Sequence, residues 1–103
     1  MTKFGMFNKF AAHAGKGEEL LQQLLKAASL VENAAGCELY IVNTSPSEPD
    51  VVWVSEIWDR EEDHRASLSN EGATELIQAT IPLLARPPEQ ILVVPVGGKG
   101  FTA

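Results

Sequence analysis

Two kinds of apolar spacing follow one another along this chain of 103 residues, and their order leaves few folds open. Apolar residues three and four apart predict amphipathic helices over residues 18–33 and again after residue 59. Alternating or β-branched runs predict four strands, at residues 3–12, 37–44, 51–58 and 91–96. The predicted order is β-α-β-β-α-β, the split βαβ arrangement of ferredoxin-like domains.

This order predicts a single α+β domain over residues 1–103, with residues 97–103 as a loose C-terminal tail. The four strands form one antiparallel sheet, and the helices cover one face of it. The opposite face is bare and carries alternate side chains that include bulky aromatics. A monomer of this size cannot expose such a face to water without a cost in free energy, so the architecture predicts a homodimer joined sheet to sheet.

Local signals refine the ends of these elements. Gly36 is expected to stop the first helix in a left-handed conformation. Asp59 and Glu62, in the segment DREE, predict a capping box at the start of the second helix. Pro82 predicts a kink or a short terminal turn, and Pro95 predicts an edge position for the last strand.

Composition narrows the choice of partners. A net charge of −6 argues against nucleic acid and anionic membranes, because both bind basic surfaces. No run of eighteen apolar residues predicts a membrane span, and the N-terminus lacks the apolar core of a signal peptide, so a cytoplasmic protein is expected. One cysteine and two histidines are too few for zinc or iron–sulfur motifs, so no metal site is expected.

The densest group of candidate functional residues lies around the end of the third strand. Glu56 and Trp58 share one face of that strand and Trp53 lies on the other, but alternation does not tell which face meets the helices. Trp58 is either a packing anchor or part of a site. His64 is either a half-buried helix residue bonded to a neighbour or a proton acceptor. His13, in a glycine-flanked loop, is expected to be solvated.

The first strand adds one polar candidate. Asn8 is the only amide on a face that otherwise carries Phe4, Met6 and Phe10. A buried polar group needs a hydrogen-bond partner, so Asn8 either bonds within the protein or faces a ligand cavity.

Two segments carry a family resemblance. GCELY, followed after a short interval by SEIWDREEDHRASL, resembles the antibiotic biosynthesis monooxygenase (ABM) domain family, in which a Gly-Cys-x-x-Tyr strand precedes a Glu-x-Trp strand end and a helix with a histidine. The matching positions here are Gly36, Cys37, Tyr40, Glu56, Trp58 and His64. The resemblance covers nearly the whole chain, including AGKGEELLQQL at the entry to the first helix.

The resemblance implies a dimeric α+β barrel of two ferredoxin-like protomers. The family includes enzymes that oxygenate aromatic polyketides or quinols without metal or flavin, enzymes that degrade haem, and members of unknown activity. Asn8 matches a first-strand asparagine of the haem-degrading members. The histidine of those members lies further along the helix than His64, near Leu68 or beyond, where this chain has none.

The expected function is therefore a cofactor-independent monooxygenase that oxidises a small aromatic molecule, quinol-like or polyketide-like, with O2. His64 is the expected proton acceptor, because the ordinary pKa of an imidazole is about 6.5. Asn8 and Trp58 are expected to donate hydrogen bonds to a developing oxyanion. The expected substrate-binding residues are Phe4, Met6, Phe10, Tyr40 and Glu56.

Two alternatives remain open for the same fold. One is a non-catalytic protein that binds a small ligand or serves in a stress response. The other is a haem-binding or haem-degrading member of the family. A monooxygenase should consume oxygen with a quinol in the presence of a metal chelator, and a haem protein should show a Soret band on haem titration. A non-catalytic binding protein should show neither.

Overall fold

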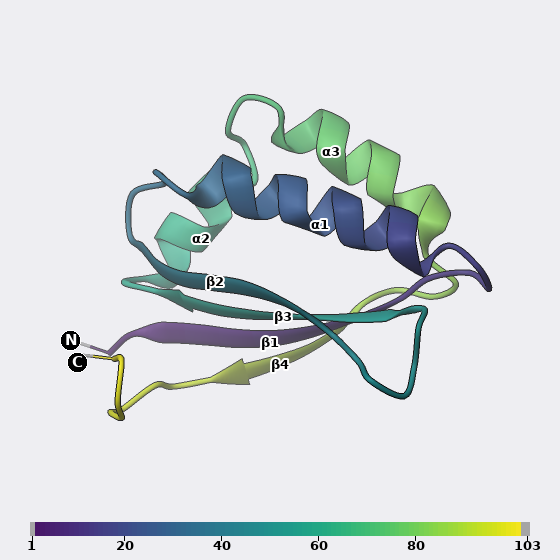
Figure 1. Ribbon diagram of the computed structural model, residues 1–103. Coiled ribbons are helices and arrows are strands. Elements are labelled where there is room, and N and C mark those ends of the chain that lie inside the picture. The colour runs from purple at the N-terminus through teal and green to yellow at the C-terminus, as the bar shows by residue number, and fades with distance from the viewer. Residues whose placement is uncertain (1, 102–103) are drawn as a thin grey trace.

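The computed structural model describes residues 2–101 and has the order β-α-β-β-α-α-β (Figure 1). Its elements are β1 (Phe4–Ala11), α1 (Gly17–Val31), β2 (Cys37–Thr44), β3 (Val51–Trp58), α2 (Glu61–Ser67), α3 (Ala73–Thr80), the 3-10 turn η1 (Ile81–Leu83) and β4 (Glu89–Val93). None of the helices in residues 2–101 is long and apolar enough to cross a bilayer.

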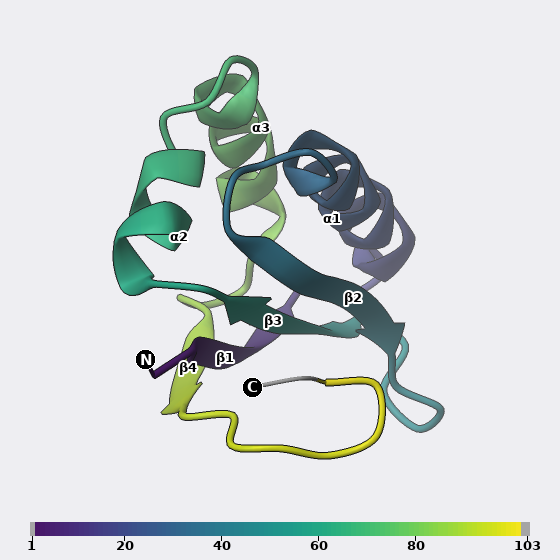
Figure 2. The same cartoon turned by 90° about the vertical axis from the view of Figure 1, so that its left-hand side faces the viewer.

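The four strands form one antiparallel sheet in the order β2-β3-β1-β4. All three helices lie on the same face of that sheet, with α1 on one side and α2 and α3 on the other (Figure 2). The predicted ferredoxin-like α+β architecture is confirmed.

The strand predictions differ from the structure mainly at the C-terminal end. β2 and β3 have the predicted bounds, whereas β4 begins two residues earlier than predicted, at Glu89, because Glu89 and Gln90 pair with the backbone of β1. It also ends three residues earlier, at Val93. Those two polar residues gave no apolar signal. β4 is an edge strand, as Pro95 predicted, and Pro82 lies in η1, which is the short terminal turn that was expected.

The predicted helix signals were partly wrong. No side chain caps α2, which begins at Glu61. The carboxylate of Asp59 instead accepts a 2.7 Å hydrogen bond from Lys3, which lowers the pKa of Asp59. Lys3 competes successfully for the side chain that was expected to form the capping box. Gly36 has a positive φ of 81°, but α1 ends at Val31, so this glycine shapes the turn into β2 rather than the helix end.

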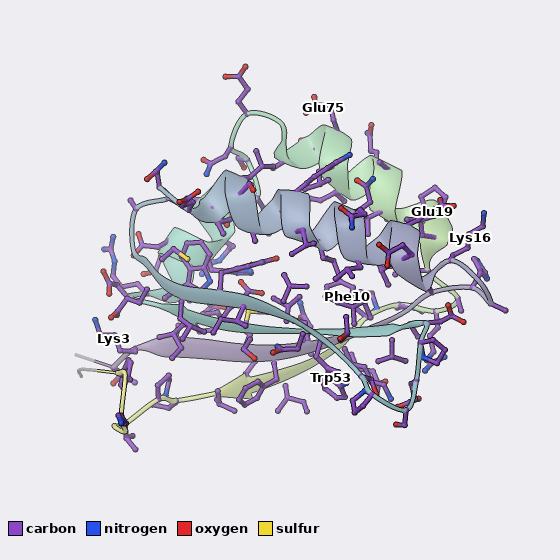
Figure 3. The ribbon with its side chains drawn as sticks, in the orientation of Figure 1. Lys3, Phe10, Lys16, Glu19, Trp53 and Glu75 are labelled. Atoms are coloured by element: carbon purple, nitrogen blue, oxygen red, sulfur yellow. The ribbon has the colours of Figure 1, made fainter. Side chains whose placement is uncertain are left out.

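The strand register decides which face of β3 meets the helices. Val52, Val54 and Trp58 are buried beneath them, and Trp58 has no exposed surface. Phe10 lies between the sheet and α1, whereas Trp53 lies on the far side of the sheet (Figure 3). Buried apolar side chains of β3 pack with Leu20 of α1 to form the core.

The far side of the sheet forms what we term the open face, made of the odd-numbered strand residues around Phe7, Ile41, Trp53, Ile57 and Ile91. Phe7, Ile41 and Ile91 are each about half exposed, at 45%, 49% and 54%. They lie in one row across the sheet, because Phe7 pairs with Ile91 on one side and Ile41 shares a neighbour, Ser55, with Phe7 on the other. The open face therefore carries a half-exposed apolar strip, which the polar Ser55 interrupts between Ile41 and Phe7.

One carboxylate attaches α1 to the loop before β3. Asp50 accepts hydrogen bonds from the backbone N–H groups of Gly17, at 2.9 Å, and Gly15, at 3.2 Å. The N-cap residue Lys16 makes no side-chain cap bond, so Asp50 supplies the acceptor from a distant loop. Gly17 is buried against this loop, and a Cβ there would collide with the backbone carbonyl of Pro49.

We therefore expect Gly17→Ala to lower the free energy of unfolding by roughly 1–3 kcal/mol, because the backbone of the loop must move to admit the methyl group. Urea denaturation measures the change. Gly97→Ala is the matched control, since a Cβ there meets no atom within 4 Å. Equal stability of the two variants would contradict the packing described here.

Candidate active site

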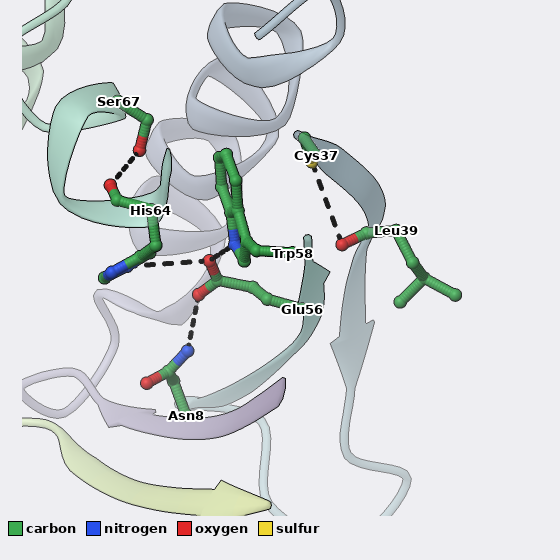
Figure 4. Close-up of polar contacts among 7 residues, drawn as sticks. All are labelled: Asn8, Cys37, Leu39, Glu56, Trp58, His64 and Ser67. Carbon is green, nitrogen blue, oxygen red and sulfur yellow. Dashed lines mark hydrogen bonds and ion pairs between the residues drawn. The ribbon is translucent and has the colours of Figure 1, made fainter. Parts of the chain in front are cut away.

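Glu56 lies at the centre of the candidate site. It projects from β3 toward the helices, only 7% exposed, between its register neighbours Met6 and Tyr40. Its carboxylate accepts two hydrogen bonds, from the amide nitrogen of Asn8 at 2.7 Å and from the indole nitrogen of Trp58 at 2.9 Å (Figure 4). Each carboxylate oxygen has one of these donors, so the buried charge is paired with polar groups on both sides.

His64 approaches the same carboxylate from α2. Its Nε2 atom lies 3.8 Å from Oε1 of Glu56 (Figure 4). The imidazole packs edge-on against Trp58, with ring centroids 5.6 Å apart, and at a tilt against Phe4, at 5.8 Å. These two aromatic contacts hold the ring at the carboxylate while part of it stays exposed. Asn8, Glu56, Trp58 and His64 together are termed the polar cluster below.

The polar cluster lines a cavity of about 290 Å³ between the sheet and the helices. Most of the remaining lining is apolar and comes from α1 and α3, including Leu24, Leu30, Ala73, Leu76 and Ile77. An apolar pocket with a few convergent polar groups is the usual form of a small-molecule site. Among the lining residues there is no lysine or arginine.

The comparisons with known proteins concern the family and the fold of the chain. The sequence model of the family described as antibiotic biosynthesis monooxygenase matches residues 4–79. The chain belongs to this family. Its matched segment carries all four residues of the polar cluster and ends one residue before Thr80, so β4 and part of the cavity wall lie beyond it.

Several solved structures share the fold. A presumed antibiotic biosynthesis monooxygenase from Chloroflexus aurantiacus J-10-fl is 36% identical, with a TM-score of 0.84 over 93% of this chain and 95% of that one. Another, from Caulobacter crescentus CB15, is 21% identical, with a TM-score of 0.84 over 93% and 92%. A protein of unknown function from Nitrosomonas europaea is 24% identical, with a TM-score of 0.81 over 100% and 97%. No curated protein matches the sequence.

In this family member, most of the residues singled out from the sequence come together. Those that line the cavity are Met6, Asn8, Phe10, Tyr40, Glu56, Trp58 and His64. Phe4 does not line it but contacts the ring of His64 from outside. His13 is exposed and is not among the residues that line the cavity.

The cavity wall formed by α3 and the segment after it was missed by the sequence analysis. Ile77 and Ile81 have the spacing of the apolar face of an amphipathic helix, yet they are 42% and 59% exposed and line the cavity. Apolar spacing identifies the inward face of a helix, but it does not distinguish a packed core from the wall of a cavity.

One predicted role is changed by the structure. Trp58 was expected to donate a hydrogen bond to an oxyanion, but indole has a single N–H and here it is donated to Glu56. The amide nitrogen of Asn8 is likewise bonded to Glu56. The indole N–H of Trp58 is therefore engaged in this arrangement, and Glu56, expected as a substrate-binding residue, is the acceptor for both donors.

The negative carboxylate also acts on two neighbouring acids. Burial raises the pKa of Tyr40 well above its ordinary value, and the charge of Glu56 raises it further. The thiol of Cys37 has a raised pKa for the same two reasons, again with burial first. Both groups stay neutral around pH 7, so neither supplies an anionic nucleophile or base. No three His, Cys, Asp or Glu side chains within residues 2–101 gather as a metal-ligand set.

We expect Glu56→Gln to lower the free energy of unfolding by roughly 1–3 kcal/mol, because a carboxamide offers one acceptor to two buried donors and turns its own NH2 toward one of them. Urea denaturation measures the loss. Glu89→Gln, on the exposed edge strand, is the control and should leave stability unchanged. A Glu56→Gln variant as stable as this control would mean that the carboxylate does not organise the site.

Proposed function

We propose that this protein is a monooxygenase that oxidises a small hydroxylated aromatic molecule with O2 and without a bound cofactor. The observation that supports this proposal is the convergence of Asn8, Trp58 and His64 on the Glu56 carboxylate at one end of an apolar cavity. Family membership supplies the reaction class, since the related structure from Chloroflexus aurantiacus is described as a presumed antibiotic biosynthesis monooxygenase.

His64 is the proposed base. Its ring is held by Trp58 and Phe4, lines the cavity and remains partly open. When the imidazole accepts the proton of a substrate hydroxyl, it becomes a cation 3.8 Å from the carboxylate of Glu56. The attraction between these opposite charges stabilises the product of the proton transfer. Glu56 thus positions and supports the base rather than removing the proton itself, since both of its oxygens already accept hydrogen bonds.

The oxidation balances without an external reductant. The deprotonated phenol transfers one electron to O2, and the aryloxyl radical and superoxide then combine to form a carbon–oxygen bond on the ring. The peroxide takes up the proton held by the base. Loss of the ring C–H proton and cleavage of the O–O bond release water and leave a second carbonyl. A phenol with a free para position and one O2 thus give one quinone and one water.

The apolar walls serve this chemistry by limiting contact with water. Side chains of α1 and α3, such as Leu24 and Leu76, line the cavity on the side opposite the sheet. Apolar walls reduce the reaction of the radical pair and the peroxide with solvent and strengthen the electrostatic contacts at the polar cluster.

The alternatives have less support. A haem carries two propionates, which need cations, and the described cavity lining includes no lysine or arginine. Ser67 and Leu68 stand where α2 ends, the region in which the haem-degrading members place their histidine. A ligand-binding protein without catalysis shares every feature of the cavity, and only the absence of oxygen uptake with a bound phenol would favour it.

We expect His64→Ala to reduce turnover by roughly 10²-fold or more, because the cavity would then lack its proton acceptor. The measurement is oxygen uptake with 1-naphthol, whose para position is free, in the presence of a metal chelator, after subtraction of the rate without protein. His13→Ala removes the other, exposed histidine and should retain the wild-type rate. Equal rates for the two variants would remove His64 from the mechanism.

We also propose that the open face is covered by the open face of a second copy. The strip through Phe7, Ile41 and Ile91 crosses all four strands and is half exposed in the single chain. Burying it against an identical strip removes apolar surface from water in both copies. The cavity lies on the opposite side of the sheet, so both copies would keep their sites.

Phe7→Glu should therefore convert a dimer into a monomer, because it places a pair of buried carboxylates near the centre of the interface. Light scattering coupled to size exclusion measures the mass of each species. Leu25→Glu, on an exposed position of α1, is the control and should remain dimeric. A wild-type protein of monomeric mass at micromolar concentration would refute the sheet-to-sheet pairing.

A further inference from the structure

One buried atom of the polar cluster has no hydrogen-bond partner. The amide oxygen Oδ1 of Asn8 is inaccessible to solvent, and within residues 2–101 no donor lies in hydrogen-bonding reach of it. Asn8 is 3% exposed and lines the cavity. A buried acceptor that lacks a hydrogen bond costs free energy. A ligand that donates a hydrogen bond to an unpartnered amide oxygen at a cavity therefore gains affinity.

The orientation of this amide is fixed by its neighbour. The Asn8 nitrogen donates to Glu56 at 2.7 Å, and its oxygen points away from the carboxylate (Figure 4). Rotating the amide by half a turn would place its oxygen against a carboxylate oxygen, which is repulsive. Trp58 holds Glu56 from the other side at 2.9 Å. Asn8 therefore presents an acceptor, and this acceptor cannot be exchanged for a donor at low cost.

The two residues joined to Asn8 in the polar cluster, Glu56 and Trp58, offer a ligand no donor at this end of the cavity. The carboxylate of Glu56 only accepts, and the single N–H of Trp58 is already used. A ligand carboxylate or phosphate would face Glu56 with no lysine or arginine among the lining residues to offset the charge. A ligand that suits this end of the cavity is neutral and carries an O–H donor.

The size of the cavity limits the remainder of the ligand. An apolar cavity of about 150 Å³ can hold benzene. The cavity here has a volume of about 290 Å³ and largely apolar walls. One or two fused aromatic rings suit this volume.

We propose that Asn8 selects substrate from product through this fixed acceptor. Before the reaction it accepts a hydrogen bond from the hydroxyl of a neutral one- or two-ring phenol, and that proton passes to His64 only when the oxidation begins. It disfavours the methyl ether and the quinone, whose oxygens have no proton to donate. The proposal deepens the proposed function by assigning the binding specificity of the same cavity. Oxidation converts the hydroxyl into a carbonyl. The carbonyl oxygen of the product cannot donate a hydrogen bond to the Asn8 oxygen, so the product binds more weakly and is released.

The test is a set of anaerobic titrations of the wild-type protein with 1-naphthol, 1-methoxynaphthalene and 1,4-naphthoquinone, followed by calorimetry. Naphthol should bind roughly tenfold or more tightly than either of the other two, because only naphthol satisfies the buried acceptor. Equal dissociation constants for the three compounds would overturn the proposal, and so would the absence of saturable binding of all three.

A variant assigns the preference to one residue. Asn8→Leu retains a similar volume without the acceptor, so the preference for naphthol over methoxynaphthalene should fall to about onefold. Asn33→Leu, at an exposed position after α1, should keep the wild-type preference. If the Asn8→Leu variant binds with the wild-type preference, the selectivity belongs to another group. If it does not fold, the wild-type titrations still decide whether the cavity demands a donor.

The oxygen measurements separate this proposal from the proposed function. A donor preference without oxygen uptake would leave the selectivity standing and refute the monooxygenase. Oxygen uptake without a donor preference would leave the monooxygenase standing and refute the selectivity of Asn8. We also expect 1,4-naphthoquinone to inhibit turnover only weakly. Inhibition by naphthoquinone at the concentrations at which the substrate itself binds would contradict the release of product by Asn8.

Discussion

The buried carboxylate of Glu56 is the contact on which the rest of the site depends. A charge in the interior of a small domain is tolerated only when hydrogen-bond donors replace the water it has lost. Asn8 and Trp58 provide those donors from β1 and from β3 itself. Donating to this carboxylate holds the amide of Asn8 and the indole of Trp58 in single orientations. The hydrogen bonds that the buried charge requires therefore determine the geometry of the other side chains.

The same charge divides the neighbouring ionisable groups by role. It acts together with burial to raise the pKa of Tyr40 and Cys37, which keeps both neutral. Histidine is the side chain that ordinarily changes charge near neutral pH. A single carboxylate thus leaves His64 as the group of this cluster suited to exchange protons, although the 3.8 Å between Nε2 and Oε1 is longer than a hydrogen bond.

The fold could be predicted from the sequence more completely than the site. Alternation located residues 37–44 and 51–58 correctly because a strand with one buried face repeats every two residues. The Asn8–Glu56 bond joins residues 48 apart and depends on the register between β1 and β3, which no local pattern encodes. The capping box failed for a similar reason, because Lys3 is distant in sequence from Asp59 but adjacent in the sheet. Long-range pairing decided each of these outcomes.

The alternation within β3 also explains how one strand can serve two purposes. Glu56 and Trp58 face the cavity, while Trp53 and Ile57 face the open side. A register shift of one residue would exchange these two sets between the faces of the sheet. Trp53 and Ile57 would then face the cavity, and Glu56 and Trp58 would face the open side. The cavity and the open face are therefore linked by register but separated by the thickness of the sheet. Changes on the open face can alter association while the polar cluster stays intact, because Glu56 takes both of its hydrogen bonds from side chains on its own side of the sheet.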